Sequence, residues 1–501
     1  MCYGISNMWP FSKAKAPVQN QPIFLTNTLT GKKEVFIPLK PGQAAMYSCG
    51  PTVYSKQHIG NLKAPLFADL VARVLESNGY RVRRIINITD VGHLVSDGDE
   101  GEDKMEVGAK REGRSAEDIA SEYTKMFQDD IRAIGLDTNA ILFPHATHYI
   151  PEQIAMVQAL EAKGFTYRTR DGIYFDTSKF PGYGKLGGIP EDHIKNGDAQ
   201  SVVDRIAMAG RGRIKQNDEK HNPTDFALWK FSPLGVIRMQ EWPSPWGRGF
   251  PGWHIECSAM SKALLGIEID IHTGGIDHIP VHHNNEIAQS ESANGRPLAR
   301  YWMHEAFVNI QEEKISKSVG NVIYLSDIVE RGYHPLALRY FFLQAHYRTP
   351  VSFTWEALGA ANEALMRLWR LAREAKDAAK GVAVHGDSSE RIRSALRDDV
   401  GTPRAIALLW EILRDEEISL KELWGAVLAA DEVLGLSLSN PPHINRSVQD
   451  STPADVLQMV REREEARAAR DFARADELRI HIENRGYAVE DSGDGPVIVR
   501  K

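Results

Sequence analysis

The feature that most constrains the fold is a strand, a loop, a helix and a second strand that follow one another between residues 43 and 91. The apolar stretch AAMYSC ends in the turn GPTVY, and HIGNLKAPLFADLVARVLESNGY then has apolar residues at helical spacing. RVRRIINITDVG follows at once as a second strand candidate. This order predicts a doubly wound α/β fold with a parallel sheet, where ligands bind at the carboxyl ends of the strands. Cys49, His58 and Thr89 are expected on that edge.

The chain leaves this alternation between about residues 98 and 245, where charged and turn-forming segments such as SDGDEGEDK and FPGYGKLGG dominate. We interpret this region as an insertion between two halves of the nucleotide fold. The second half resumes at PGWHIECSAMSKALLG and IEIDIHTGG, which brings Cys257 to the same edge, and a helix is expected to begin near Val281. After KISKSVGN the pattern is mostly helical, and an arginine-rich helix that turns at Gly486 into a terminal hairpin closes the sequence.

Composition narrows the class of protein without deciding its partners. With 42% hydrophobic and 25% charged residues, the 501-residue chain is typical of a globular protein of several domains. A formal charge of −7 leaves RNA binding undecided, because a basic face can lie on an acidic body. Three cysteines exclude a disulfide framework and indicate a reducing compartment. With neither a signal peptide nor a membrane span in its pattern, the chain is expected to be cytoplasmic.

The stretch IPVHHNNEIAQSE carries two histidines and a carboxylate within little more than one helical turn. His282 and Glu286 are spaced i, i+4 and His283 and Glu286 i, i+3, so either pair shares a helix face and can offer a nitrogen and an oxygen to one metal ion. An exposed polar helix has the same pattern. The stretch therefore needs further ligands from elsewhere in the chain to become a metal site.

Two short motifs flank the insertion and point to a nucleotide. HIGN lies at a helix start, where free backbone N–H groups and the helix dipole favour phosphate, Gly60 allows close approach and His58 can donate a hydrogen bond. KISKS holds Lys314 and Lys317, which can neutralise charge on a phosphate during its transfer. Each motif is weak evidence alone, because many surface loops hold two lysines. The two motifs together, in this order on either side of an insertion that splits a nucleotide fold, are strong evidence for a nucleotide-binding site.

These residues resemble the HIGH and KMSKS signatures of class I aminoacyl-tRNA synthetases. More narrowly, the chain resembles the cysteinyl-tRNA synthetase family from about residue 22 to 501. The matching segments are CGPTVY, NITD, DFALWKFS, PGWHIECSAMS, GGIDHIPVHHNNEIAQSE, YWMH and REEARAARDFARADELR. The resemblance implies a zinc ion held by Cys49, Cys257, His282 and Glu286, so that the i, i+4 pair is the one that binds. Two thiolates, an imidazole and a carboxylate are zinc ligands by type.

The resemblance also implies what this zinc does. Cysteine must be told from serine, and a hydrophobic pocket separates such close analogues by only about 1 to 3 kcal/mol. Zinc binds a thiolate far better than a neutral hydroxyl, so selection by the metal makes a separate editing site unnecessary.

Other roles follow from the same resemblance. Asp277 is implied to receive the substrate ammonium, Trp253 to form an aromatic wall of the amino-acid pocket and Thr89 to line it, although Trp253 has the alternative of a core aromatic. ATP is implied to bind through His58, Gly60, Asn61 and Lys317, with Lys314 assisting; His58, Asn61, Lys314 and Lys317 form the catalytic set.

Two departures from the family pattern stand out. Asn284 lies where the family usually has a glutamate, and VGHLVSDGD replaces the acidic pair that commonly follows NITD. Neither removes an implied zinc ligand. The second affects the expected pocket rim around Thr89 and His93.

The sequence thus predicts a monomeric enzyme that joins L-cysteine to AMP from ATP, with magnesium, and transfers it to the 3′ end of tRNA(Cys), without a membrane partner. Two alternatives remain: a ligase that attaches cysteine to an amino sugar in mycothiol synthesis, and a catalytically silent paralogue that binds zinc and RNA. The expected units are a disordered N-terminal tail (1–21), the first half of the catalytic fold (22–139), a connective insertion (140–245), the second half (246–300), a stem-contact region with the KISKS loop (301–352), a helical bundle (353–440) and an anticodon-recognition unit (441–501).

Overall fold

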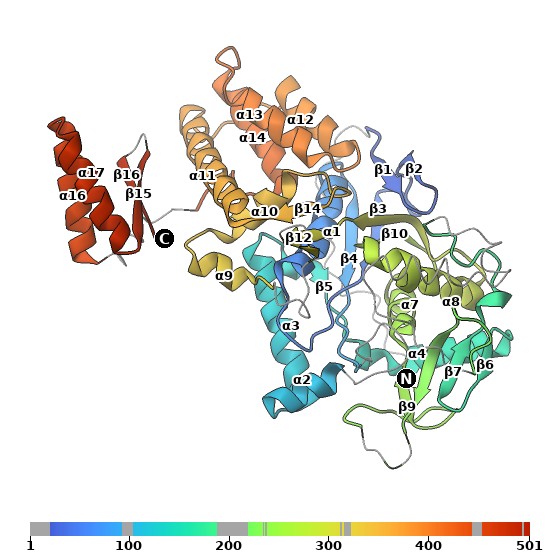
Figure 1. Ribbon diagram of the computed structural model, residues 1–501. Coiled ribbons are helices and arrows are strands. Elements are labelled where there is room, and N and C mark those ends of the chain that lie inside the picture. Colours follow the sequence, from blue (N-terminus) through green and yellow to red (C-terminus); the bar gives the residue numbers. More distant parts are fainter. Residues whose placement is uncertain are drawn as a thin grey trace.

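The computed structural model describes residues 21–92, 104–187, 219–233, 235, 238–310, 313–314, 322–442, 453–492 and 495–500. Figure 1 shows a central α/β body, helices grouped on one side of it, and a small C-terminal unit that stands apart. Within the described ranges, no helix is both long and apolar enough to cross a membrane.

A five-stranded parallel sheet forms the centre of the body. Its spatial order is β11-β10-β3-β4-β5, and every neighbouring pair is parallel. Numbered along the chain this order is 5-4-1-2-3, the doubly wound arrangement, in which the strand order reverses between β3 and β10. The predicted fold class is confirmed. The strands are β3 (Gln43–Ser48), β4 (Arg81–Ile86), β5 (Ile141–Leu142), β10 (Ile269–Gly275) and β11 (Ala299–Glu305).

The inserted region builds a second, antiparallel sheet with the order β6-β7-β8-β9. Its strands are β6 (Thr166–Arg168), β7 (Gly172–Phe175), β8 (Phe226–Phe231) and β9 (Gly249–Pro251). Two strands lie beyond the limits that we expected for their units: β5 pairs with the parallel sheet although it follows residue 139, and β9 pairs with the antiparallel sheet although it follows residue 245. β5 has two residues and β9 has three, too few to show a repeating hydrophobic pattern in the sequence. Only their pairing in the structure shows to which sheet each strand belongs.

Helices and smaller sheets make up the rest of the part of the chain that the structure describes. The helices are α1 (Ile59–Ser77), α2 (Lys104–Glu112), α3 (Ala116–Ala133), α4 (Ile150–Ala162), α7 (Trp253–Leu265), α8 (Asn284–Asn294), α9 (Leu325–Glu330), α10 (Pro335–Leu343), α11 (Trp355–Ala378), α12 (Asp387–Arg397), α13 (Thr402–Ile412), α14 (Leu420–Leu434), α16 (Ala454–Ala468) and α17 (Phe472–Asn484). The remaining strands are β1 (Phe24–Asn27), β2 (Lys32–Val35), β12 (Val308–Ile310), β13 (Glu313–Lys314), β14 (Val351–Phe353), β15 (Tyr487–Ser492) and β16 (Gly495–Arg500).

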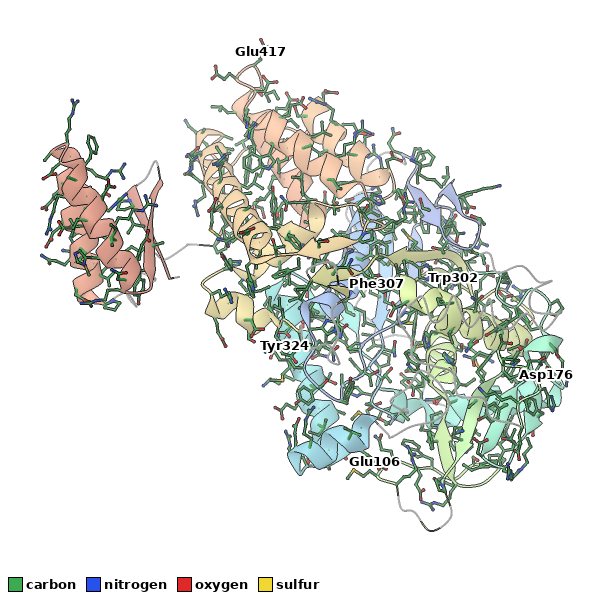
Figure 2. The ribbon with its side chains drawn as sticks, viewed as in Figure 1. Glu106, Asp176, Trp302, Phe307, Tyr324 and Glu417 are labelled. Atoms are coloured by element: carbon green, nitrogen blue, oxygen red, sulfur yellow. The ribbon has the colours of Figure 1, made fainter. Side chains whose placement is uncertain are left out.

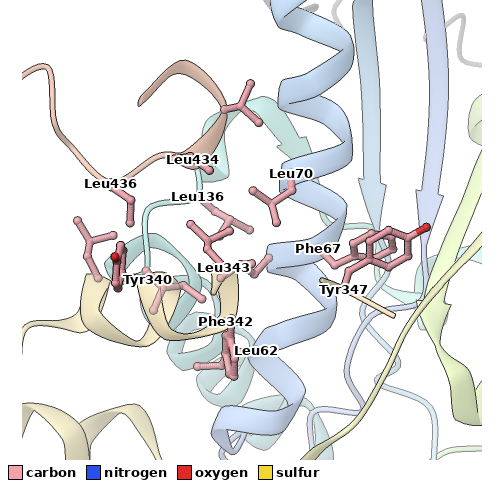
Figure 3. Packing of buried hydrophobic residues seen from close by; sticks show 14 of the residues in the cluster. Leu62, Phe67, Leu70, Leu136, Tyr340, Phe342, Leu343, Tyr347, Leu434 and Leu436 are labelled. Carbon is pink, nitrogen blue, oxygen red and sulfur yellow. The ribbon is translucent and has the colours of Figure 1, made fainter. Parts of the chain in front are cut away.

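Helix α1 joins the parallel sheet to the helical region. Its apolar side chains pack against α10 and the end of α14, with Leu62, Phe67 and Leu70 among the residues of this core (Figure 3). Phe67 stacks on Tyr347 with ring centroids 4.4 Å apart. Because α1 begins with the HIGN residues, this packing fixes the start of the helix relative to both the sheet and the helices behind it.

The C-terminal unit has a small core of its own, formed by Val456, Val460, Ile482, Tyr487, Val489 and Ile498. The terminal hairpin after Gly486 is present as β15 and β16. The single arginine-rich helix that we expected is wrong, because the chain breaks between α16 and α17. Arg470 adopts a left-handed φ of 59°, and the Asp471 side chain then caps α17 by accepting from the Arg474 N–H at 3.1 Å.

Candidate zinc and nucleotide site

The two thiols come from separate elements that meet at the carboxyl edge of the parallel sheet. Cys49 directly follows β3, and Cys257 lies in the second turn of α7. A Cβ on Gly50 would fall 1.6 Å from the backbone oxygen of Asn87, so only glycine allows the β3 loop to approach the end of β4 this closely. The Gly50 N–H donates to the Asn87 side chain at 2.9 Å. The sulfur atoms of Cys49 and Cys257 lie 3.9 Å apart.

The histidine and the carboxylate come from the segment that follows β10. Ile279–His283 forms a π-helical turn, and α8 begins only at Asn284. The regular helix that we expected from near Val281 is therefore wrong in its first turn. His282 Nε2 nevertheless lies 3.1 Å from Glu286 Oε1, so the i, i+4 pair does share a face.

Four donors of the predicted set meet at the strand-order reversal between β3 and β10. Their ligand atoms all lie within 4.8 Å of one another: Cys49, Cys257, His282 and Glu286. A second group keeps Cys49 and Glu286 but uses His272 and His283. The first group contains two thiols and the second only one, and zinc favours thiolates, so the donor chemistry favours His282 over His283. Cys49 is the only partly exposed member of the first group; the other three are buried.

The charges at this site are set by its burial and its hydrogen bonds. The hydrogen bond between the Cys49 and Cys257 sulfur atoms lowers the pKa of Cys257 to about 7, against the effect of burial. Burial raises the pKa of Cys49 well above its usual range. Burial also opposes charge on Glu286 and His282. The attraction of His272 and then of His282 outweighs it and holds the pKa of Glu286 well below its usual range, and the Glu286 carboxylate raises the pKa of His282 to about 10. A divalent cation would replace these protons, because thiolates and neutral imidazoles are the ligand forms.

A ring of further side chains surrounds the four donors. His254 lies 2.8 Å from His282 Nδ1, and His272 Nε2 lies 3.0 Å from Glu286 Oε2. Trp302 of β11, labelled in Figure 2, stacks on the His272 ring with centroids 4.6 Å apart. Such contacts fix the tautomer and orientation of ligating groups. Sequence reasoning missed His254 and His272, although both stand in segments that it singled out, PGWHIECS and IEIDIHTGG.

The HIGN signature lies at the start of α1, beside the chain that follows the KISKS loop. His58 caps α1, and its Nδ1 accepts the Asn61 N–H at 3.3 Å, which leaves Nε2 as the proton-bearing nitrogen of the neutral ring. The Ile59 N–H donates to the Ile323 oxygen at 2.9 Å, so the HIGN segment touches the chain that follows the KISKS loop. Lys314 lies in β13, paired with Asn309. Lys317 lies outside the described residues.

Comparisons with known proteins agree with this geometry. Residues 35–363 match the family model for the "tRNA synthetases class I (C) catalytic domain", and residues 449–496 match the "Cysteinyl-tRNA ligase anticodon binding domain". The cysteine–tRNA ligase 1 of Burkholderia lata is 46% identical over 475 residues, which cover 95% of this chain and 96% of that protein. The chain belongs to the cysteine–tRNA ligase family. The relative from Novosphingobium aromaticivorans is 41% identical, with 95% and 97% covered.

Solved structures of more distant class I synthetases share the fold of this family member. A methionyl-tRNA synthetase of Mycobacterium tuberculosis has a TM-score of 0.52 at 14% identity, covering 80% of this chain and 92% of its own. A leucyl enzyme in a ternary complex from Agrobacterium radiobacter has a TM-score of 0.53 at 13% identity, with 82% and 88% covered. At such identities the likeness concerns the fold alone.

Of the pocket residues that the resemblance implied, Trp253 contacts one of the candidate metal donors. Trp253, one helical turn before Cys257, lies against His282 with ring centroids 4.5 Å apart. Asp277 follows β10, and Thr89 is buried at the end of β4, where its hydroxyl accepts from the Asn87 amide at 3.2 Å. Asn87 also lies 3.7 Å from the Cys257 sulfur, and sequence reasoning missed it. His93 lies outside the described residues.

Proposed function

We propose that this protein is a cysteine–tRNA ligase that activates L-cysteine with ATP to cysteinyl adenylate and pyrophosphate, and then transfers the cysteine to the 3′ end of tRNA(Cys). The observation that carries the proposal is the convergence of Cys49, Cys257, His282 and Glu286 within 4.8 Å at the ligand-binding edge of the sheet. The family membership supports the same reaction.

A zinc ion fits this donor set, with two thiolates, one imidazole and one carboxylate as its ligands. The zinc would bind the substrate sulfur as a thiolate and so supply the distinction from serine that a hydrophobic pocket lacks. Cys49 is partly exposed, whereas Cys257, His282 and Glu286 are buried. A substrate can therefore reach the site from the side on which Cys49 lies.

Other residues of the chain bind and orient the substrates. His58 Nε2 can donate to an ATP phosphate, since Nδ1 is taken by the Asn61 N–H, and Gly60 and Asn61 lie in the same first turn of α1. Lys314 and Lys317 are proposed to neutralise phosphate charge. Magnesium is proposed to enter with ATP.

In the amino-acid pocket, the proposed roles are an acceptor for the ammonium at Asp277, an aromatic wall at Trp253 and a lining residue at Thr89. Contact between Trp253 and His282 supports the second role, because it places the indole beside the metal donors. The three cysteines of the chain support a reducing, cytoplasmic location.

The amino-sugar ligase is the nearest alternative, since it would use the same zinc pocket and nucleotide motifs. The match of residues 449–496 to an anticodon-binding domain favours tRNA as the acceptor. A silent zinc-binding paralogue is disfavoured because His58, Asn61, Lys314 and Lys317 are all present.

One pair of assays tests the proposal. Cysteine-dependent exchange of labelled pyrophosphate into ATP is expected, together with charging of a fraction of total tRNA with cysteine and not with serine. Exchange without tRNA charging would favour the amino-sugar ligase. Absence of both activities in folded, zinc-loaded protein would leave only the silent paralogue.

A further inference from the structure

The side chain of Asn284 ties two separate parts of the molecule to the segment that carries the metal donors. Its amide nitrogen donates to the Leu186 oxygen at 3.0 Å and to the Ile279 oxygen at 2.7 Å. Its amide oxygen accepts the Leu186 N–H at 3.2 Å. The residue is 1% exposed, so none of these bonds can be exchanged for bonds to bulk water without opening the structure.

Only an amide satisfies all three partners. The Leu186 peptide offers one donor and one acceptor, and the Ile279 carbonyl is a second acceptor, so the side chain must supply two N–H groups and one oxygen. A carboxylate of the same shape would meet the Leu186 and Ile279 carbonyl oxygens with no proton to share. Leaving the buried Leu186 carbonyl and the partly buried Ile279 carbonyl without a donor costs free energy, which explains why this chain has asparagine here.

The Ile279 bond falls on the π-helical turn that orients the two adjacent histidines. Such turns are rare and occur mostly as single turns at functional sites. Within this turn His282 Nε2 lies 3.1 Å from Glu286, whereas His283 Nε2 lies 3.9 Å from Glu286 and 3.3 Å from the Cys49 sulfur. Both imidazoles are thus within reach of the same donors, and a change in the turn would alter which one faces them.

The insertion loop, residues 183–187, is packed tightly on the same turn. Gly187 has a φ of +89°, and a Cβ built on it would lie 2.6 Å from Ile279 Cγ2. The loop is also bonded to α8 at two other points, since Tyr183 donates to the Asn285 side chain and Lys185 pairs with Glu291 at 2.7 Å. Of these side-chain bonds, those of Asn284 alone reach the π-helical turn.

We propose that Asn284 is a positioning residue that clamps the insertion loop onto the π-helical turn and thereby holds His282, rather than His283, as the imidazole ligand of the metal. The inference rests on the proposed zinc site. Its consequence is that the insertion takes part in the choice of amino acid, through the bond between Leu186 and Asn284, although it supplies no metal ligand of the predicted set.

The test compares Asn284→Asp and Asn284→Ala with Tyr183→Phe in the full-length protein. Tyr183→Phe is the matched control because it removes a loop-to-α8 bond and leaves the turn untouched. The measurements are zinc affinity by competition with a chromogenic chelator, the absorption spectrum of the cobalt-substituted protein, and the KM values for cysteine and ATP in pyrophosphate exchange. Circular dichroism and thermal unfolding confirm that each variant is folded. If Asn284→Asp does not fold, Asn284→Ala takes its place in the comparison.

The Asn284 variants are expected to lose between about tenfold and 100-fold in zinc affinity, the usual effect of losing a residue that orients a ligand. Their cobalt spectrum should change, and the KM for cysteine should rise while that for ATP stays constant. Tyr183→Phe should change none of these. Unaltered zinc affinity and cobalt spectrum in folded Asn284 variants, or equal losses in Tyr183→Phe, would overturn the inference. Failure of the unmodified protein to bind zinc would instead refute the zinc site itself.

Discussion

At the scale of single residues, the candidate site depends on two thiols that are 208 positions apart in the chain and 3.9 Å apart in space. Their role can be tested with one substitution. Cys257→Ser replaces a thiolate by a neutral hydroxyl, a much poorer zinc ligand, so both zinc content and cysteine activation should fall by at least about tenfold. Elemental analysis and pyrophosphate exchange measure these two quantities.

Cys2→Ser is the control for that experiment, since Cys2 lies outside the described residues and in none of the motifs. It should change neither zinc content nor cysteine activation. Equal behaviour of the two variants would contradict the assignment of Cys257 as a ligand.

Removal of the metal is a second test at this scale. Zinc is proposed to bind the substrate sulfur, so metal-free protein that remains folded should lose cysteine activation and should gain no activity with serine. Pyrophosphate exchange before and after chelation, and again after zinc is restored, measures this. Cysteine activation that survives in folded, metal-free protein would exclude a direct role for the ion.

The convergence of the four candidate ligands could be predicted from the sequence, whereas the residues that contact them could not. Cys49, Cys257, His282 and Glu286 stand in segments whose order matches a family pattern. His254 and Asn87 reach the same site through contacts between α7, the end of β4 and the metal-binding turn, which no local spacing encodes. Such contacts depend on the tertiary fold, and so they appear only in the structure.

At the scale of elements, a buried charge cluster joins α1 to α10. Asp69 lies 2.7 Å from Arg73, 3.0 Å from Arg84 and 2.8 Å from Arg339, and both Asp69 and Arg339 are fully buried. Arg339 also donates to the Leu434 oxygen at 2.5 Å, which extends the link to the end of α14. The cluster therefore connects the helix that begins with HIGN to the helical region.

Asp69→Asn should destabilise the protein by about 3 to 5 kcal/mol at pH 7, because the buried guanidinium groups of Arg84 and Arg339 and the partly exposed one of Arg73 would lose their counter-charge. Burial raises the pKa of Asp69, but the charges of Arg73, Arg84 and Arg339 outweigh it and hold that pKa well below its usual range. A carboxyl group with a depressed pKa adds stability above its unfolded pKa of about 4 and loses it as the pH falls through the folded value. The effect of the substitution should therefore be full at pH 7 and decrease below about pH 4.

Denaturant unfolding at several pH values measures this prediction, with Asp129→Asn as the control. Asp129 pairs with Arg132 at 2.5 Å, but both side chains are more than half exposed, so its loss should change stability little. If Asp69→Asn lowered the free energy of unfolding no more than Asp129→Asn does, the buried cluster would contribute little to the connection between α1 and α10.

Element types were easier to predict than their ends. The strand, helix and strand at the start of the fold have clear periods, and α1, β3 and β4 lie where these periods indicate. The π-helical turn at Ile279–His283 was not predicted, because its bond to Asn284 and its contact with the insertion loop are tertiary. The break at Arg470 was not predicted because arginine is a good helix former and rarely adopts positive φ.

At the scale of the whole molecule, the C-terminal unit has its own core, so its arginines can be considered separately from the catalytic body. The sequence leaves two interpretations of the arginine-rich run open: a solvated helix with i, i+4 ion pairs, or RNA contact through Arg461, Arg463, Arg467 and Arg470. The structure buries Arg463, whose side chain is 5% exposed and lies 2.6 Å from Glu464, so this residue cannot be an open phosphate contact. Arg461 and Arg470 are exposed, and neither has an ion-pair partner among the residues that the structure describes.

The last prediction uses this difference between free and paired arginines. The double substitution Arg461→Glu and Arg470→Glu should weaken tRNA binding and reduce its dependence on salt by about one unit of log–log slope per lost phosphate contact. Deletion of residues 441–501 should have a larger effect of the same kind and should also reduce the dependence on anticodon sequence. Adenylate formation should stay nearly constant in both, because the metal and HIGN residues lie elsewhere in the chain.

The matched control replaces two arginines that already have acidic partners by glutamate, so that the change in net charge is the same: Arg474, which lies 2.7 Å from Glu477, and Arg479, which lies 3.4 Å from Glu483. Their guanidinium groups are engaged within the helix, so tRNA affinity should change less than in the first pair. Filter binding across a salt series, with tRNA(Cys) and an anticodon variant, separates the outcomes. Equal losses of tRNA affinity from both pairs would mean that only net charge matters. Unchanged tRNA affinity in the truncated protein would show that the helices of the C-terminal unit are solvated surfaces and that the tRNA binds to the catalytic body.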